Sequence, residues 1–211
     1  MSPSDSGLFI SIEGGEGAGK STVIAALSDL LSADGREVVL TREPGGTPEG
    51  EAIRAVLLDP GNHVVPEAEL LLMFAARAQL VRRLIRPALA RGAAVVADRF
   101  TDASYAYQGG GRGLEMGRIA ELERWAAGIR PDLTFLLDVG VAQGLARARS
   151  RGGEPDRIER EREDFFERVR AVYLARAAAE PARFRVIDAS QPADAVQSAV
   201  RAALTEWLRS R

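Results

Sequence analysis

One stretch near the start of the chain, residues 14–21, constrains the fold more than any other part of the sequence. It reads Gly-Gly-Glu-Gly-Ala-Gly-Lys-Ser and fits the pattern G-x-x-x-x-G-K-[ST] of a phosphate-binding loop. An apolar run at residues 8–12 precedes the loop directly, and a helical pattern at residues 21–32 follows it. The motif requires a strand before it and a helix after it, so its context agrees with it at both ends.

Each residue type in this loop has a physical role in binding phosphate. Glycines let backbone N–H groups turn inward onto a β-phosphate, and the helix N-terminus adds a partial positive charge. Lys20 can reach the β- and γ-phosphate oxygens, and the hydroxyl of Ser21 can ligate Mg²⁺. The alternative interpretation is a glycine-rich turn that carries Lys-Ser without a ligand. We expect a nucleoside triphosphate to bind here, although the loop does not identify the group that receives the phosphate.

The rest of the chain alternates between short apolar runs and helical stretches. The five apolar runs lack polar alternation, as expected for strands buried on both faces of a parallel sheet; they lie at residues 8–12, 38–40, 93–97, 134–137 and 184–187. Helical periodicity is found at residues 21–32, 67–90, 157–179 and 193–209. No linker or repeat interrupts this alternation. Residues 1–211 are therefore predicted to form a single doubly wound α/β domain.

Composition excludes several classes of function. The formal net charge of −2 provides no positive surface for a nucleic acid backbone. The chain has no cysteine and one histidine, His63, which excludes disulfides, thiolate metal sites, cysteine nucleophiles and His-dependent triads. No apolar run reaches the roughly 18–20 residues of a membrane helix, and the polar start does not resemble a signal peptide. We expect a cytoplasmic protein that binds neither membrane nor nucleic acid.

A carboxylate and a guanidinium, Asp98 and Arg99, directly follow the apolar run at residues 93–97. At the carboxyl end of a central strand, Asp98 would lie beside the phosphate loop and hold a Mg²⁺-bound water. Arg99 would donate two parallel hydrogen bonds from its guanidinium to a phosphate across the cleft. An internal salt bridge between the two residues is the alternative, and the phosphate loop upstream favours the functional interpretation.

Four arginines surround a Gly-Gly pair between residues 147 and 157. Arg147 and Arg151 share a helix face at i,i+4, and the glycine pair then ends the helix. This layout suits a mobile lid, at about residues 148–157, that closes arginines over the transferring phosphoryl group. The alternative is a solvated charged face, which we favour for residues 159–170. Of the four arginines, Arg151 is the candidate for catalysis.

Two other classes of phosphate-loop protein find no support in the sequence. A GTPase would carry an Asn/Thr-Lys-x-Asp guanine motif. A motor, a partition ATPase or an ABC cassette would usually carry an element for self-association, such as Leu-Ser-Gly-Gly-Gln. Neither element occurs in the chain. The residues therefore favour a small kinase.

Taken together, these segments resemble the bacterial thymidylate kinases (dTMP kinases). The matching segments run in family order over nearly the whole chain, at residues 13–22, 41–47, 98–99, 105–113, 130–134 and 156–159. Two of these segments are more specific to the family than the phosphate loop. They are residues 41–47, Thr-Arg-Glu-Pro-Gly-Gly-Thr, and residues 105–113, which contain Tyr-Gln-Gly-Gly-Gly-Arg-Gly. The resemblance implies a P-loop kinase fold with a five-stranded parallel sheet flanked by helices. It also implies a homodimer that phosphorylates dTMP to dTDP with ATP and Mg²⁺, a step in dTTP synthesis.

The resemblance assigns two sets of binding residues. The residues implied for ATP form the loop and the start of its helix: Gly14, Gly15, Glu16, Gly17, Ala18, Gly19, Lys20, Ser21 and Thr22. The residues implied for dTMP are Glu16, Arg54, Phe74, Arg77, Arg99, Ser104 and Tyr107. Phe74 would stack on thymine, although from the residues alone it would be interpreted as a core residue. Arg77 would face a base carbonyl, and Ser104 would contact the base edge.

The remaining implied roles concern the sugar and the phosphates. Glu16 would hold the 3′-hydroxyl, Tyr107 would crowd C2′, and Arg54 and Arg99 would bind the acceptor phosphate. Gly17 stands where some family members carry a loop arginine, so the chain resembles members that supply the catalytic arginine from the lid, here Arg151.

The dTMP phosphate is largely ionised at neutral pH, so no strong general base is needed. Lys20, Arg99 and Arg151 would act by alignment and charge neutralisation, with Mg²⁺ held by Ser21 and Asp98. The alternatives are a kinase for another nucleoside monophosphate or for a deoxynucleoside, and a nucleotide-dependent switch.

Overall fold

Within residues 7–150, 152 and 154–210, which the computed structural model describes, the chain forms a five-stranded parallel sheet. The strands are β1 Leu8–Gly14, β2 Val38–Arg42, β3 Ala94–Asp98, β4 Leu133–Asp138 and β5 Phe184–Asp188. Their order is β2-β3-β1-β4-β5, and every neighbouring pair is parallel. Each strand contains most or all of one predicted apolar run, so the predicted sheet is confirmed.

Helices connect the strands. Their bounds are α1 Lys20–Ala33, α2 Pro48–Leu58, α3 Pro66–Leu80, η2 Val81–Ile85, α4 Arg86–Ala90, α5 Thr101–Ser104, η3 Tyr105–Gly111, α6 Met116–Leu122, η4 Glu123–Ala127, α7 Val141–Ser150, α8 Glu163–Ala179 and α9 Ala193–Arg209. The segments η2, η3 and η4 are π-helical turns. None of the helices in the described ranges has the length and apolar composition needed to cross a membrane.

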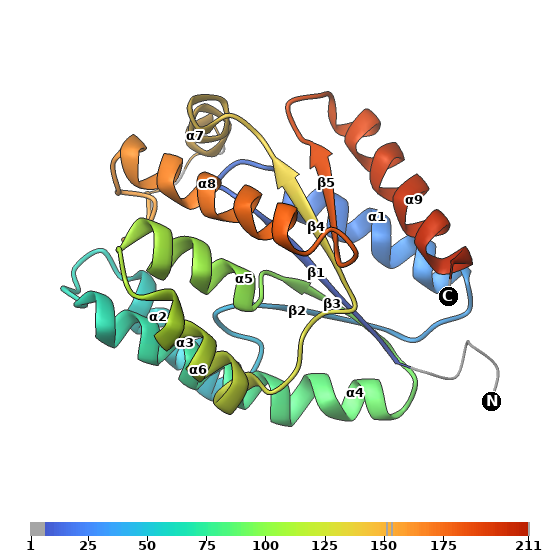
Figure 1. Ribbon diagram of the computed structural model, residues 1–211, viewed down its shortest axis with the longest axis horizontal. Helices are drawn as coiled ribbons and strands as arrows, with labels where there is room; N and C mark the ends of the chain where they lie inside the picture. Colours follow the sequence, from blue (N-terminus) through green and yellow to red (C-terminus); the bar gives the residue numbers. More distant parts are fainter. Residues whose placement is uncertain (1–6, 151, 153, 211) are drawn as a thin grey trace.

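The sheet is covered by helices on both faces (Figure 1). Because side chains alternate along a strand, Ile10 of β1 faces one layer and Phe9 faces the other. Ile10 belongs to a buried cluster with α1 and α9, whereas Phe9 packs with η2 and α4. On the same side as Phe9, α8 and η3 pack together beside β4 in a further cluster that includes Leu136. Buried apolar layers on both faces explain why the central strands show no polar alternation.

The long helix predicted at residues 67–90 is present but is not a uniform α-helix. It runs as α3, then the π-helical turn η2, then α4. The N–H of Arg86 bonds to the carbonyl of Val81, five residues back, directly before Pro87. Proline has no N–H to donate and clashes with the carbonyl four residues earlier, which accounts for an irregular turn at this place.

The helix predicted at residues 157–179 begins later than expected. Asp156 and Glu159 form the reciprocal hydrogen bonds of a capping box, since Asp156 Oδ1 accepts from the Glu159 N–H at 2.8 Å and Glu159 Oε2 accepts from the Asp156 N–H at 3.2 Å. They cap only a short turn at residues 157–160, and the N–H of Arg157 bonds to the carbonyl of Leu58 in α2. The helix α8 itself begins at Glu163. The predicted start at residue 157 is therefore wrong.

The central strand β1 lies between β3 and β4, so the loop after β1 and the residues after β3 share one edge of the sheet. Ile12 is paired with Asp98 in the β1–β3 register, and Arg42 of β2 is paired with the same residue. In open parallel sheets ligands bind outside the carboxyl ends of the strands where the strand order reverses. The phosphate loop and the Asp98–Arg99 pair meet at this place.

Candidate active site

The phosphate loop joins β1 to α1 and depends on left-handed glycines. Gly17 and Gly19 have φ values of 68° and 87°, and Gly14 has a φ of 143°. A side chain at Gly17 would also collide with the backbone carbonyl of Gly144 in α7. An arginine at Gly17 would require both the loop and α7 to move, which gives a physical reason for its absence from the loop.

The start of α1 is open to an anion. Among the described residues no side chain caps this helix, its first turn has no acidic residue, and Gly19 at the N-cap has no side chain. Its first N–H groups and its dipole therefore face the cleft. Lys20 Nζ lies over the loop, 3.3 Å from the carbonyl oxygen of Gly15 and 3.5 Å from that of Gly14. Burial lowers the pKa of Lys20, and a bound phosphate would stabilise its charged form.

Arg99 meets the phosphate loop through its side chain. Its Nη1 donates to the carbonyl of Gly14 at 2.9 Å and its Nη2 donates to Glu16 Oε1 at 2.8 Å. Tyr107 donates its hydroxyl to the same Glu16 oxygen at 2.9 Å, and its ring lies 4.7 Å from the guanidinium carbon. Arg99 forms its ion pair with Glu16 rather than with Asp98, so the structure does not support an internal Asp98–Arg99 salt bridge.

The residues predicted to hold Mg²⁺ are compatible with that ion. Asp98 Oδ1 is buried and has no hydrogen-bond partner among the described residues. A buried, unpartnered carboxylate oxygen is costly unless a ligand satisfies it. Ser21 lines the same cavity as Asp98. Mg²⁺ is usually held by one or two protein oxygens together with water and phosphate, which is the donor set available here.

One cavity of about 540 Å³ brings most of the predicted residues together. The predicted residues in its wall are Glu16, Gly17, Ala18, Gly19, Lys20, Ser21, Thr22, Arg54, Asp98, Arg99 and Tyr107. Arg54 belongs to α2 and donates to the carbonyl of Pro44 at 3.0 Å. Cavities of this size hold small-molecule ligands.

Three residues assigned to the base lie behind the cavity wall rather than in it. Arg77 is fully buried and donates to Glu43 Oε2 at 2.8 Å and to Ser104 Oγ at 3.0 Å. Its guanidinium lies 4.4 Å from the centre of the Phe74 ring, which packs in an apolar cluster with Leu70. Phe74, Arg77 and Ser104 thus form one contiguous layer, and their direct contact with a base stays a prediction.

The structure adds residues to the wall that sequence reasoning missed. Met73, the neighbour of Phe74, lines the cavity in front of this layer, together with Gln108. Glu69 is 1% exposed and accepts from Gln108 Nε2 at 2.8 Å and from Arg157 Nη2 at 2.6 Å. In the sequence, Glu69 resembles an ordinary acidic residue in the first turn of a helix, where a negative charge interacts favourably with the helix dipole. The sequence therefore contained no signal for this buried network.

The described part of the lid places its arginines in different surroundings. Arg147 lines the cavity and donates to the carbonyls of Ala189 and Ser190 at 2.7 and 3.0 Å. Arg157 donates to the carbonyl of Leu57 at 2.7 Å in addition to Glu69. Arg151 lies outside the described residues.

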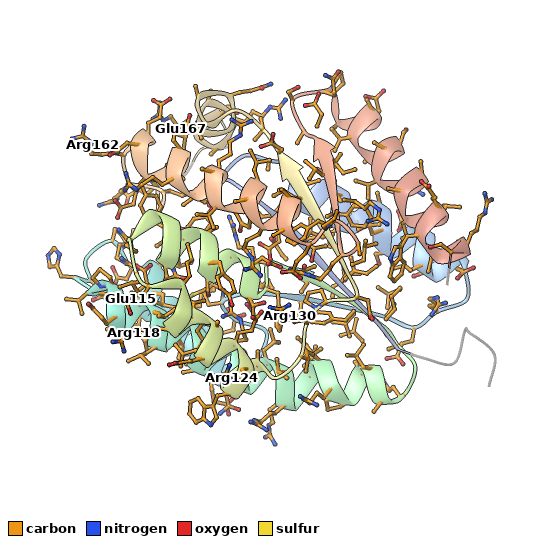
Figure 2. The ribbon with its side chains drawn as sticks, viewed as in Figure 1. Glu115, Arg118, Arg124, Arg130, Arg162 and Glu167 are labelled. Atoms are coloured by element: carbon orange, nitrogen blue, oxygen red, sulfur yellow. The ribbon has the colours of Figure 1, made fainter. Side chains whose placement is uncertain are left out.

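The charged segment after the lid is only partly a solvated face. Figure 2 shows Arg162 at the outer end of α8, directed away from the sheet, and its side chain is 92% exposed. Arg170 instead pairs with both oxygens of Asp138, at 2.7 and 2.9 Å. The expected solvated face therefore applies to the start of α8 and not to its middle.

A family model described as thymidylate kinase matches residues 12–200. The chain belongs to the thymidylate kinase family. A thymidylate kinase of Chromohalobacter salexigens is 60% identical over 207 residues, which cover 97% of this chain and 98% of that protein. A thymidylate kinase of Pseudomonas fluorescens is 58% identical over 204 residues, covering 96% and 97%. The crystal structure of a thymidylate kinase from Ehrlichia chaffeensis has a TM-score of 0.78 and 31% identity, covering 95% of this chain and 99% of that one.

Membership of the thymidylate kinase family confirms several predictions. Thymidylate kinases are ATP-dependent phosphotransferases, so the chain is an enzyme of this class. The structural likeness confirms the P-loop kinase fold predicted from the alternating pattern. A nucleotide-dependent switch or a kinase of another family is not favoured by these relatives.

Proposed function

We propose that the protein transfers the γ-phosphoryl group of ATP to the phosphate of dTMP, giving dTDP and ADP. The observation that carries the proposal is the position of Arg99. Its guanidinium contacts the phosphate loop at Gly14 and Glu16 while lining the same cavity as Lys20. A phosphate held by Arg99 would lie beside a triphosphate held by the loop, which is the arrangement that transfer between two nucleotides requires.

In the proposed reaction an oxygen of the dTMP phosphate attacks the γ-phosphorus of ATP. The bond between that phosphorus and the β–γ bridging oxygen breaks, and ADP leaves with the electron pair. The attacking oxygen is already ionised at neutral pH, so no proton needs to be removed. Lys20 stabilises the charge on the β- and γ-phosphate oxygens, and Arg99 aligns the acceptor. Arg151 is assigned to the transferring group as part of a mobile lid at about residues 148–157.

Mg²⁺ is part of this proposal. Ser21 and the unpartnered oxygen of Asp98 are the residues that would hold it, the second through a bound water. When bound, Mg²⁺ neutralises charge on the β- and γ-phosphate oxygens.

The acceptor is assigned to the part of the cavity lined by Arg54, Arg99 and Tyr107. Arg54 and Arg99 bind its phosphate, Glu16 holds the 3′-hydroxyl, and the Tyr107 ring crowds C2′ and disfavours a ribose. The base lies towards Met73, with the Phe74–Arg77–Ser104 layer behind it.

We also propose that the enzyme is a single-domain homodimer. We propose that it is cytoplasmic, since it uses the nucleotide pool of the cell. Leu71 of α3 and Trp125 of η4, two elements that pack against each other, are 58% and 79% exposed. Their position on two elements that pack together, and not their exposure alone, is what favours a protein interface here. Sedimentation equilibrium is expected to give twice the chain mass of 22.6 kDa. A monomer at the concentrations used for the assay would contradict this assignment.

A coupled assay of ADP release tests the proposed substrate. Equal concentrations of dTMP, dUMP, UMP, CMP, AMP, GMP and thymidine are offered in turn with ATP and Mg²⁺. We expect strong release with dTMP and weak release with the ribonucleotides, because Tyr107 crowds C2′. Release that does not depend on an acceptor would overturn the proposal in favour of a hydrolytic switch, and stronger release with another acceptor would identify a different kinase.

A further inference from the structure

A carboxylate is buried directly before the phosphate loop. Glu13 is the penultimate residue of β1, is 0% exposed, and does not belong to the described wall of the cavity. Removing a carboxylate from water is costly, so a central strand normally carries an apolar residue at such a position. Neither the phosphate loop nor the transfer chemistry proposed above uses this side chain. Its contacts must therefore explain why it is buried.

Both oxygens of Glu13 bind groups that hold Arg99. Oε1 accepts from the backbone N–H of Phe100 at 2.7 Å, directly after Arg99. The N–H of Arg99 itself bonds to the carbonyl of Ile12 at 3.0 Å. Arg99 has a φ of 71° and is the one non-glycine residue with positive φ in the described ranges. Such a conformation persists only when neighbouring hydrogen bonds hold it, and these two bonds do so on either side of Arg99.

The second oxygen holds the Arg99 side chain through a tyrosine. Tyr173 of α8 donates its hydroxyl to Glu13 Oε2 at 2.7 Å. Arg99 Nη1 in turn donates to the Tyr173 hydroxyl oxygen at 3.2 Å. Tyr173 is 1% exposed, so this chain of hydrogen bonds is shielded from water. Low local polarity strengthens such bonds and fixes the geometry of the groups that they join.

We propose that Glu13 and Tyr173 are positioning residues, which hold the backbone and the guanidinium of Arg99 where the acceptor phosphate binds. The inference rests on the proposed function, because it takes Arg99 as the ligand of that phosphate. Neither residue contacts the substrate in this account; each acts through Arg99. Loss of either is expected to weaken binding of the acceptor more than binding of ATP.

The charge of Glu13 gives a second, independent readout. Burial and the nearby Asp102 raise the pKa of Glu13 to about 8, against the opposing effect of Arg99. As the pH rises through this value, Glu13 becomes an anion beside Arg99 and reduces the positive charge available to the acceptor phosphate. Tyr173 stays neutral in this range, because burial raises its pKa well above the ordinary value. Lys20 also lies near Glu13, whose charge raises the pKa of Lys20, so the KM for ATP is followed over the same pH range to report on Lys20 separately.

The experiment measures initial rates of the full chain with ATP and dTMP at pH 7 and pH 9. Tyr173→Phe removes the hydroxyl and keeps the ring. Its matched control is Tyr105→Phe. The Tyr105 hydroxyl donates to Glu123 Oε2 at 2.9 Å, and neither Tyr105 nor Glu123 lines the described cavity. Glu13→Gln keeps the size of the side chain and an acceptor oxygen for the Phe100 N–H, and it removes the ionisable carboxyl group. It is therefore a mimic of the neutral form that cannot ionise.

Tyr173→Phe is expected to raise the KM for dTMP about fivefold to tenfold, the size expected for loss of one typical intramolecular hydrogen bond. The KM for ATP is expected to stay within about twofold. Tyr105→Phe is expected to leave both values within about twofold. The wild-type KM for dTMP is expected to rise severalfold from pH 7 to pH 9, and that of Glu13→Gln is expected to lack this rise.

Two results would overturn the inference: kinetics of Tyr173→Phe that match those of Tyr105→Phe, or parallel pH profiles for the wild type and Glu13→Gln. Because each is judged against a wild type that phosphorylates dTMP, failure of the inference is distinct from failure of the proposed function. In the latter case the wild type itself would show no dTMP-dependent release of ADP.

Discussion

Arg99→Ala is expected to lower kcat for dTMP-dependent ADP release by about 10³-fold or more, the range measured for arginines that stabilise phosphoryl transfer. The variant leaves the phosphate loop and Lys20 in place, so ATP should still bind. It removes the guanidinium that lies between the loop and the acceptor, together with its bonds to Gly14 and Glu16. Steady-state rates with saturating dTMP, and the KM for ATP, measure the two effects separately.

Arg170→Ala is the matched control for Arg99→Ala. Arg170 also forms an ion pair at the carboxyl end of a strand, with Asp138, but it lies outside the described wall of the cavity. Its loss should leave kcat within a few-fold of the parent. If Arg99→Ala behaved like this control, Arg99 would not be the acceptor ligand and the proposed mechanism would be wrong.

Arg151→Ala is expected to lower turnover by a similar factor of about 10³. Two of the other arginines around the Gly-Gly pair line the cavity and already bind other groups. Arg147 is engaged with the carbonyls of Ala189 and Ser190, and Arg157 is engaged with α2 and Glu69. Arg149 and Arg151, which lie between these two residues in the sequence, are therefore the candidates for the catalytic arginine.

Arg149→Ala is the control for Arg151→Ala, since Arg149 is exposed on α7. Single-turnover rates with preformed complexes isolate the chemical step from product release. A reduction with Arg149→Ala and none with Arg151→Ala would move the catalytic role to the neighbour. Turnover within a few-fold of the parent for both would remove the lid from the mechanism.

The sheet and the phosphate loop could be predicted because their signals are local. Residues 8–12 and 93–97 are continuous apolar runs, and only a buried parallel strand accommodates such runs before Gly14 and Asp98. Gly14, Gly17 and Gly19 have positive φ, a conformation that favours a residue without a side chain. Physical constraints of this kind act within a few residues and do not depend on the rest of the fold.

The helical turn η3 could not be predicted from local preference. It contains Gly109, Gly110 and Gly111, and glycine disfavours a helix interior by about 1 kcal/mol per residue. The reason for these glycines lies elsewhere in the chain. A Cβ at Gly110 would come within 2.6 Å of Val172 Cγ2, and one at Gly111 would collide with Phe165. Close packing of η3 against α8 therefore selects glycine and overrides its low helix propensity.

Long-range contacts also explain the part of the candidate site that sequence reasoning missed. Glu69 and Arg157 are 88 residues apart and meet only because α3 and the end of the lid lie together. Glu13 and Tyr173 are 160 residues apart. A family resemblance assigns residues that touch the substrate, whereas residues that hold those contacts in place emerge only when the fold brings them together.

The most direct test of the account follows the phosphoryl group itself. The wild-type enzyme is incubated with γ-labelled ATP, Mg²⁺ and dTMP, and the products are separated by ion-exchange chromatography. We expect the label to appear in dTDP, in an amount equal to the ADP formed, and we expect Arg99→Ala to suppress this transfer. Label released as inorganic phosphate at the same rate with and without dTMP would contradict the proposed function.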